Sequence, residues 1–351
     1  MCLRCYSENP GSIVQGNHMA SHIDPLDLNI IISDRERRSG ALSIENTQLG
    51  VMLLHARGYV VLKGAVPESL VTELYARFKT MYKDNVQRLH AEGHRTRFIG
   101  EGENGHSVFW EKNSRFRIFP KLRGPFANPL VVRNSFAESI LAETLGADYY
   151  CKFVSSDTCA KGAITQAPHR DIDFYDEDTV RGCYVNIALM HCGLHNGPTE
   201  VWPGGSHLWR SDKFFKFNLR PFGEDNANPA MEAFVSHLPS KKLELQPGDL
   251  LIRDPGMWHR GTPNSTDEPR TMMTIGYFRK DYYYEYGDPF FSMDENIYKA
   301  LDPTVQELFA PFFNKGDWRY WKLRKSQAIR HLKGRQYLSA PLRIGIRWLA
   351  G

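Results

Sequence analysis

Two stretches that are far apart in the sequence hold side chains that could bind one metal ion. His169 and Asp171 are separated by a single residue and follow an apolar run flanked by turn residues. Because successive side chains of a β-strand point to opposite faces, this spacing places both on one face if the segment is a strand. His259 follows a turn, strand and turn pattern over residues 247–258 and is a candidate third ligand. Two imidazoles and one carboxylate leave the opposite metal positions open, as a non-haem Fe(II) oxygenase requires for its cosubstrate and O2.

The pattern of a histidine followed two residues later by an acid is weak when taken alone. It also occurs at His22 and His90, but the first lies in a polar N-terminal segment and the second in a basic helical one. Neither segment offers a strand that would hold a paired ligand. A further signal is Arg270, which stands eleven residues after His259 at the start of an apolar run. A guanidinium can bind a carboxylate through two parallel hydrogen bonds, which lysine does less well, so Arg270 indicates a dicarboxylate cosubstrate.

Together, the three candidate ligands, Arg270 and the intervening Pro/Gly-rich block 196–207 resemble the phytanoyl-CoA dioxygenase (PhyH-like) family of Fe(II)/2-oxoglutarate-dependent oxygenases. The resemblance runs over residues 58–278 and rests on four motifs in the same order. It implies a mainly β protein with a double-stranded β-helix (a jelly-roll or cupin-like fold), flanking N-terminal helices and a C-terminal helical extension.

The resemblance also assigns roles within the site. It implies that three residues bind Fe(II) and carry the chemistry: His169, Asp171 and His259. It implies that Arg270 anchors the far carboxylate of 2-oxoglutarate, with Gln166 and Asn186 as further candidates for the cosubstrate pocket. At Asn186 the sequence departs from a tryptophan that is frequent in the family.

Substrate contacts are expected on two segments. Asp173, Phe174 and Tyr175 come just after the ligand pair and are candidate substrate-binding residues, with packing at the barrel rim as the alternative. The basic, Gly-containing segment 90–124 corresponds to a variable lid in the family, so we expect loops there that touch substrate. The alternative for this segment is a pair of strands carrying ordinary aromatic residues.

The composition indicates one globular domain with extensions. Apolar residues make up 42% of the 351 residues and charged residues 24%, which are ordinary values and disfavour disordered or membrane-spanning classes. The N-terminus lacks the pattern of a secretory signal, and six cysteines at irregular spacing do not form a disulfide framework. We therefore expect a cytoplasmic protein, divided into a flexible arm over 1–44, the oxygenase domain over 45–314 and a basic extension over 315–351.

Hydrophobic periodicity predicts several elements around the candidate ligands. Helices are predicted over 45–55, from Pro67 onward, and between an N-cap at Asn134 and Gly146. Strands are predicted over 59–62, 149–155, 163–168 and 182–190. In this arrangement the strand 163–168 delivers the chain to His169.

The C-terminal extension is strongly basic. It holds ten Lys or Arg residues against Asp317 alone, a net charge of +9 in a chain whose total is +4, with Trp318 and Trp321 among its apolar residues. Such a segment is typical of contact with an acidic lipid surface, an acidic carrier protein or an anionic substrate. The alternative is a solvated helix that packs its apolar side on the barrel. Since no base-reading module accompanies the charge, no nucleic-acid partner is expected.

These observations predict an Fe(II)/2-oxoglutarate-dependent dioxygenase that oxidises an unactivated C–H bond of a small organic substrate, such as a natural-product or acyl-type intermediate. Hydroxylation is the expected outcome. Succinate and CO2 would be released. The carboxylate at Asp171 disfavours halogenation, since related halogenases have a small residue there. Two alternatives remain: a cupin-type enzyme that uses another divalent ion, and a catalytically silent barrel that binds partners through its basic segment. Arg270 disfavours the first, because only a dicarboxylate cosubstrate explains it.

Overall fold

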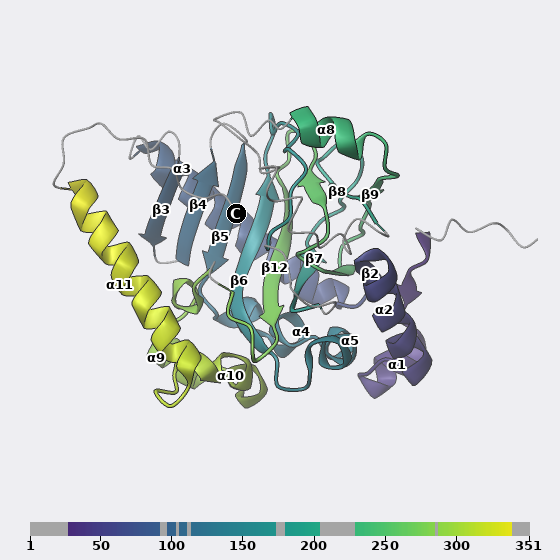
Figure 1. The fold of residues 1–351 in the computed structure, drawn as a ribbon, viewed down its shortest axis with the longest axis horizontal. Coiled ribbons are helices and arrows are strands. Elements are labelled where there is room, and N and C mark those ends of the chain that lie inside the picture. Colours follow the sequence, from purple (N-terminus) through teal and green to yellow (C-terminus); the bar gives the residue numbers. More distant parts are fainter. Residues whose placement is uncertain are drawn as a thin grey trace, which may run out of the picture.

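A large, mostly antiparallel sheet forms the centre of the molecule (Figure 1). The computed structural model describes residues 27–91, 97–102, 105–110, 114–172, 180–203, 229–284 and 287–338. Nine strands lie in the order β1-β2-β10-β7-β12-β6-β5-β4-β3, and β1 and β2 are parallel to each other. Their bounds are β1 Ile30–Ile31, β2 Tyr59–Lys63, β3 Arg97–Gly102, β4 Gly105–Trp110, β5 Arg115–Pro120, β6 Tyr150–Cys159, β7 Gly182–Ala188, β10 Leu250–Arg253 and β12 Arg270–Phe278.

A second, smaller sheet packs on the central one. Its strands lie in the order β11-β8-β9, with β8 at Thr199–Val201, β9 at Lys241–Leu243 and β11 at His259–Gly261. An apolar cluster joins the two sheets: Val201 and Leu243 of the small sheet are buried together with Val61, Leu251 and Met272 of the large one. The sequence stretch that ends at His259 is therefore held against one face of the central sheet.

Most of the helices cover the opposite face of the central sheet; the helices at 229–235 and 318–338 pack instead beside the small sheet and on an aromatic cluster around Tyr184. The helices are α1 Asp34–Ser39, α2 Ile44–Arg57, α3 Glu68–Ala91, α4 Pro129–Val132, α5 Ser135–Leu145, α8 Pro229–Val235, α9 Glu295–Ala300, α10 Pro303–Phe309 and α11 Trp318–Leu338. In Figure 1, α1 and α2 lie at the right of the sheet, α9 and α10 below it, and α11 at the left. The main core contains Leu54, Leu74 and Ile140 from the helices packed with Val185 and Ile275 from the strands.

Several elements lie where the sequence predicted them. Helix α2 extends the predicted 45–55 by a few residues, and α3 begins directly after Pro67. The side chain of Asn134 accepts hydrogen bonds from the first turn of α5, and the helix ends at Gly146 with a φ of 87°. Cap residues mark these ends because a side-chain oxygen can satisfy the exposed amides of a first turn.

The predicted strand over 163–168 is wrong. The described residues 163–168 lie outside any strand, and His169 makes only an isolated bridge with His259. Two amides of the segment reach β11, namely Gln166 N to Gly261 O and His169 N to His259 O, at 3.0 and 2.9 Å. These amides are three residues apart, whereas a regular ladder needs a spacing of two, and Pro168 between them has no amide hydrogen to donate.

Residues 27–44 hold regular structure, in contrast to the flexible arm predicted over 1–44. Strand β1 pairs with β2, and α1 has a capping box in which Ser33 and Glu36 satisfy each other's amides. The Glu36 carboxylate also accepts hydrogen bonds from Ser43 N and Asn46 Nδ2, each at 2.8 Å. Burial opposes its ionisation, but these hydrogen bonds outweigh burial and lower the pKa of Glu36 to about 2. Residues 1–26 lie outside the described part.

The segment 90–124 forms strands where we expected loops. Strands β3, β4 and β5 make an antiparallel meander that extends the central sheet, which agrees with the alternative reading of this region. Helical residues also outnumber strand residues in the described chain, so the fold is a large antiparallel sheet with flanking helices rather than a mainly β protein.

The basic C-terminal segment forms α11 up to Leu338. Leu323 is 1% exposed and packs into an aromatic cluster with Tyr150 and Phe312, while Trp321 on the same helix is 60% exposed. The helix therefore buries one apolar side on the body of the protein. Within the residues that the structure describes, no helix has the length and apolar character needed to cross a membrane.

Candidate active site

The three candidate metal ligands are brought together by backbone pairing of the loop that holds His169 and Asp171 with the start of β11 and the turn before it. His169 and His259 exchange two hydrogen bonds, N to O at 2.9 and 3.0 Å, and Asp171 N donates to Pro255 O at 2.9 Å. This pairing replaces the strand that the sequence suggested. It holds the two histidines opposite each other and carries Asp171 to the same place.

The side chains of these residues converge on one point. Asp171 Oδ2 lies 3.2 Å from His259 Nε2, and Asp171 Oδ1 lies 3.9 Å from His169 Nε2. One ligand atom of each residue lies within 4.8 Å of the others, and among the described residues they form the one cluster of this kind. Metal–ligand bonds of about 2.1 Å at right angles put neighbouring ligand atoms roughly 3 Å apart, so the observed separations fit a single ion.

The hydrogen bonds of the imidazoles also fit a metal. Nδ1 of His169 lies 2.8 Å from Ala167 O, and Nδ1 of His259 lies 3.0 Å from Met257 O. A carbonyl oxygen can only accept, so each Nδ1 carries a proton and Nε2 is the ring atom left to bind a metal. Burial, followed by the neighbouring His259, lowers the pKa of His169 to about 4, which keeps that ring neutral.

The third ligand is held by a residue that the sequence analysis missed. Arg253, the last residue of β10, donates from Nη2 to Asp171 Oδ2 at 2.8 Å and has a side chain 6% exposed. Its guanidinium lies 4.8 Å from the ring centroid of Tyr184. Burial opposes ionisation of Asp171, but His259 and Arg253 outweigh it and hold the pKa of this carboxyl well below its usual range. A charged residue at the end of the apolar run 250–252 was the signal that could have revealed it.

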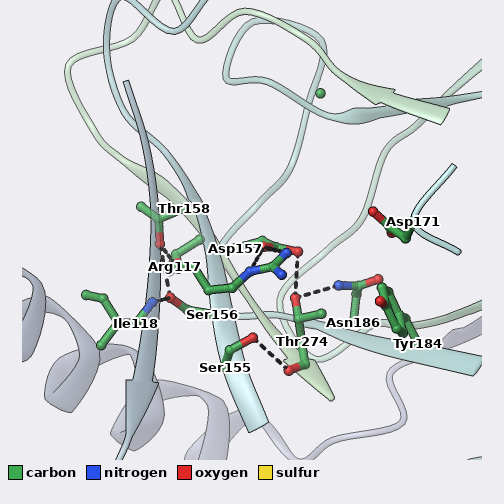
Figure 2. Close-up of polar contacts among 12 residues, drawn as sticks. Arg117, Ile118, Ser155, Ser156, Asp157, Thr158, Asp171, Tyr184, Asn186 and Thr274 are labelled. Atoms are coloured by element: carbon green, nitrogen blue, oxygen red, sulfur yellow. Dashed lines mark hydrogen bonds and ion pairs between the residues drawn. The ribbon is translucent and has the colours of Figure 1, made fainter. Parts of the chain in front are cut away.

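A partly buried polar relay crosses four strands of the central sheet beside this cluster (Figure 2). Arg117 of β5 pairs with Asp157 of β6, Nη2 to Oδ1 at 2.6 Å. Thr274 of β12 donates to Asp157 Oδ2 at 2.9 Å, and Asn186 of β7 donates from Nδ2 to Thr274 Oγ1 at 2.8 Å. Each member takes its position from the strand register, so the relay lies across a single face of the sheet.

The predicted cosubstrate residues occupy this region. Asn186 is 2% exposed and belongs to the relay, so its amide nitrogen is committed to Thr274. Arg270, the first residue of β12, is 3% exposed and donates from Nε and Nη2 to Gly197 O at 2.9 and 2.6 Å. Gln166 Oε1 accepts from Gly261 N at 2.8 Å, which ties the segment before His169 to the segment after His259.

Three further candidates cannot be placed. Asp173, Phe174 and Tyr175, predicted to contact substrate, lie outside the described residues.

Comparison with known families gives one match. The model of the family described as phytanoyl-CoA dioxygenase (PhyH) matches residues 54–272, which is more than half of the chain. The matched range contains all three ligands of the cluster and Arg270.

Among curated proteins, the chain is similar to "Dioxygenase andF" of Emericella variicolor, with 31% identity over 144 residues. This alignment spans 39% of the chain and 43% of the length of that protein. Solved structures with a similar fold include the non-heme alpha ketoglutarate dependent epimerase SnoN and the carbocyclase SnoK, both from nogalamycin biosynthesis. Their identities are 17% and 18% and their TM-scores 0.46 and 0.47; each alignment covers 68% of this chain, with 82% of SnoN and 85% of SnoK.

Proposed function

Since this chain belongs to the phytanoyl-CoA dioxygenase family, we propose that it is an Fe(II)- and 2-oxoglutarate-dependent dioxygenase that oxidises a C–H bond of a small organic substrate. One observation carries this proposal. Two imidazoles and one carboxylate present their ligand atoms within 4.8 Å of each other, with both Nδ1 atoms already committed to carbonyls. Such a set suits a metal that must keep several positions open.

In this proposal His169, Asp171 and His259 bind Fe(II), and Arg270 binds the far carboxylate of 2-oxoglutarate. Bound iron would couple the oxidative decarboxylation of 2-oxoglutarate by O2, which gives succinate and CO2, to oxidation of the substrate. Gln166 and Asn186 position the surrounding backbone and relay. The protein thus supplies ligand orientation and charge around the reacting groups.

The orientation of the ligands is set before any metal binds. Carbonyl acceptors fix both imidazole tautomers, and Arg253 keeps Asp171 ionised and turned toward His259. Outer partners of this kind raise metal affinity because the free site need not rearrange on binding.

We further propose that the two sheets form a double-stranded β-helix. Two observations support this arrangement: the cluster around Val201 and Met272 joins the two sheets face to face, and the bridge between His169 and His259 ties the segment before Asp171 to β11. Hydroxylation is the simplest outcome, and a natural-product or acyl-type molecule is the proposed substrate class. The cytoplasmic setting and the three-part division of the chain stay predictions.

Arg270 favours the oxygenase over the cupin-type alternative. It is buried, and no described carboxylate pairs with it. A buried cation without a counter-ion is costly, and an anionic cosubstrate removes that cost. A metal enzyme that used no dicarboxylate would leave this charge uncompensated.

The test is succinate formation from 2-oxoglutarate by Fe(II)-loaded protein exposed to O2. We expect turnover in the wild type, its loss in His169→Ala, and a fall of about 100-fold in Arg270→Met, since a charge-assisted pair contributes about 1.5–3 kcal/mol. His195→Ala, which changes an exposed histidine outside the cluster, is the matched control and should keep full turnover. Turnover that persists in His169→Ala would overturn the proposal.

A second readout covers the case in which turnover needs the true substrate. Calorimetry under nitrogen should detect 2-oxoglutarate binding that requires Fe(II) and is lost in His169→Ala. If the wild type showed neither turnover nor metal-dependent binding of 2-oxoglutarate, the proposed oxygenase function would be wrong.

A further inference from the structure

Helix α11 has one side on the body of the protein and the other in solvent (Figure 1). Leu323 is 1% exposed within the aromatic cluster, and Gln327 Nε2 donates to Asp288 Oδ2 at 3.1 Å. The Arg319 guanidinium lies 5.0 Å from the ring centroid of Tyr150. Residues 319, 323 and 327 are spaced by four and so form one stripe along the helix. This stripe fixes which side of α11 is left open to a partner.

Two tryptophans lie on the solvent side of α11. Trp318 and Trp321 are 44% and 60% exposed, and no other tryptophan or phenylalanine is exposed among the residues whose side chains the structure describes. Trp321 is held in place, because its Nε1 donates to Lys315 O at 2.9 Å and its ring packs edge-on against Tyr320. The polar N–H is thus used within the protein, and the part of the indole that meets water is its apolar ring. A partner that covers this ring gains free energy.

Basic side chains surround the two indoles. Four of them are exposed: Lys315, Lys322, Arg324 and Lys325. The nearby acid Asp317 pairs with Arg319, Oδ2 to Nη2 at 2.6 Å, on the stripe that faces the body. Residues 318–351 contain no Asp or Glu. The open side of α11 therefore presents positive charge alone, next to exposed apolar rings.

This combination favours the surface of a bilayer over a folded protein as the partner. Protein interfaces match charges of both signs to reject wrong partners, whereas α11 offers a single sign. Anionic headgroups present a diffuse negative charge, and the interfacial layer of a bilayer accepts indole rings. A helix with lysine, arginine and tryptophan on its exposed side is typical of one that lies in such an interface. The charge and the apolar surface of α11 are thus complementary to the same partner.

We propose that α11 docks the protein on the surface of a membrane that contains anionic lipids. Trp318 and Trp321 enter the headgroup layer, and the basic residues around them contact the phosphate and carboxylate groups of the lipids. The stripe of Arg319, Leu323 and Gln327 stays on the body, so the fold need not change on binding. Docking of this kind is independent of the reaction at the metal cluster.

The test measures how much full-length protein sediments with lipid vesicles at about 0.1 M NaCl. One set of vesicles is phosphatidylcholine alone, and in the other about a third of the lipid is anionic phosphatidylserine. We expect binding to the anionic set only. Binding should be lost at about 1 M NaCl, because the Debye length falls from about 10 Å to about 3 Å.

Two variants separate the contributions of charge and of apolar surface. The double variant Arg324→Gln, Lys325→Gln should weaken binding to the anionic vesicles by about 25-fold, since each basic residue near such a surface contributes about fivefold. Trp321→Ala should weaken binding by about tenfold, because the indole is no longer buried in the headgroup layer. Both variants change exposed side chains, so their thermal midpoints should equal that of the wild type.

Matched controls lie on α1 and α2, at the other end of the sheet from α11 (Figure 1). The double variant Arg35→Gln, Arg38→Gln removes two exposed basic residues of α1. Met52→Ala truncates an apolar side chain of α2 that is 67% exposed. Both controls should bind the anionic vesicles as tightly as the wild type.

Three outcomes would contradict the proposal. A wild-type protein that does not bind the anionic vesicles would exclude a membrane partner of this kind. Full binding by both α11 variants would place the contact on another surface. If only the double charge variant lost binding, and poly-glutamate displaced the wild type from the vesicles, the partner of α11 would be an acidic protein and not a bilayer.

Discussion

The two faces of the central sheet are built from the same strands but differ in chemistry. Along β12, Met273, Ile275 and Tyr277 enter the main apolar core beneath the helices, while Arg270 and Thr274 point to the opposite face. The alternation of a strand separates the two sets residue by residue. The helical face therefore carries the main core, whereas the other face combines charged groups with smaller apolar clusters, so substitutions at Ile275 and at the metal ligands should affect different measurements.

The largest effect is expected at the metal cluster. His259→Ala removes one of three ligands, and metal affinity should fall by at least about 100-fold, since loss of an outer partner alone costs 10- to 100-fold. Calorimetric titration with Zn(II) measures this. The thermal midpoint of the metal-free protein should stay within a few degrees of the wild type. His237→Ala, an exposed histidine elsewhere, is the control.

A substitution on the helical face should lower stability and leave the metal affinity unchanged. Ile275 is 0% exposed, and Ile275→Ala should lower the free energy of unfolding by about 2–5 kcal/mol because it leaves a cavity in the core. Denaturant unfolding measures the loss. Ile31→Ala, at a side chain 73% exposed, should change stability little. A large fall in Zn(II) affinity of folded Ile275→Ala protein would show that the two faces are not separable in this way.

Arg253 tests whether charge on the polar face supports the ligands. Arg253→Met removes the hydrogen bond that orients Asp171, and Zn(II) affinity should fall by about 10- to 100-fold. Arg133→Met breaks ion pairs with Glu138 and Glu307 on the helical side and should leave that affinity unchanged. Equal losses of Zn(II) affinity in the two variants would show that the contact between Arg253 and Asp171 does not determine that affinity.

The smallest effect is expected within the relay. Thr274→Val keeps the side-chain volume but removes the hydroxyl that links Asp157 to Asn186, and stability should fall by about 1–2 kcal/mol. Thr144→Val removes a hydroxyl that bonds only within α5, and a smaller change is expected there. If Thr274→Val were as stable as the wild type, the hydrogen bonds of the relay would make no net contribution to the free energy of unfolding.

Local signals in the sequence predicted a large part of this fold. Asn134 and Pro67 mark helix ends through interactions within a few residues, so α5 and α3 could be located. The spacing of His169 and Asp171, together with the distant His259, indicated a cluster that the structure brings together. The strand predicted over 163–168 is wrong, and an isolated bridge from His169 to the first residue of β11 aligns the ligands instead.

The remaining features depend on partners far apart in the chain. Arg253 owes its role to Asp171, and Arg117 owes its position in the relay to Asp157 on the neighbouring strand. An arginine in a strand has no local property that reveals such partners. The regular structure of residues 30–44 likewise depends on the pairing of β1 with β2, which periodicity over so short a stretch does not report.

The reciprocal backbone bridge between His169 and His259 links metal retention to local opening of the chain. Each of these residues contributes a metal ligand and also donates its amide hydrogen to the other's carbonyl. Exposing either amide to solvent therefore requires the two imidazoles to separate. A bound ion stabilises the closed form by mass action and should slow hydrogen–deuterium exchange at these two amides. Their exchange rates and the rate of metal release would then report the same opening event.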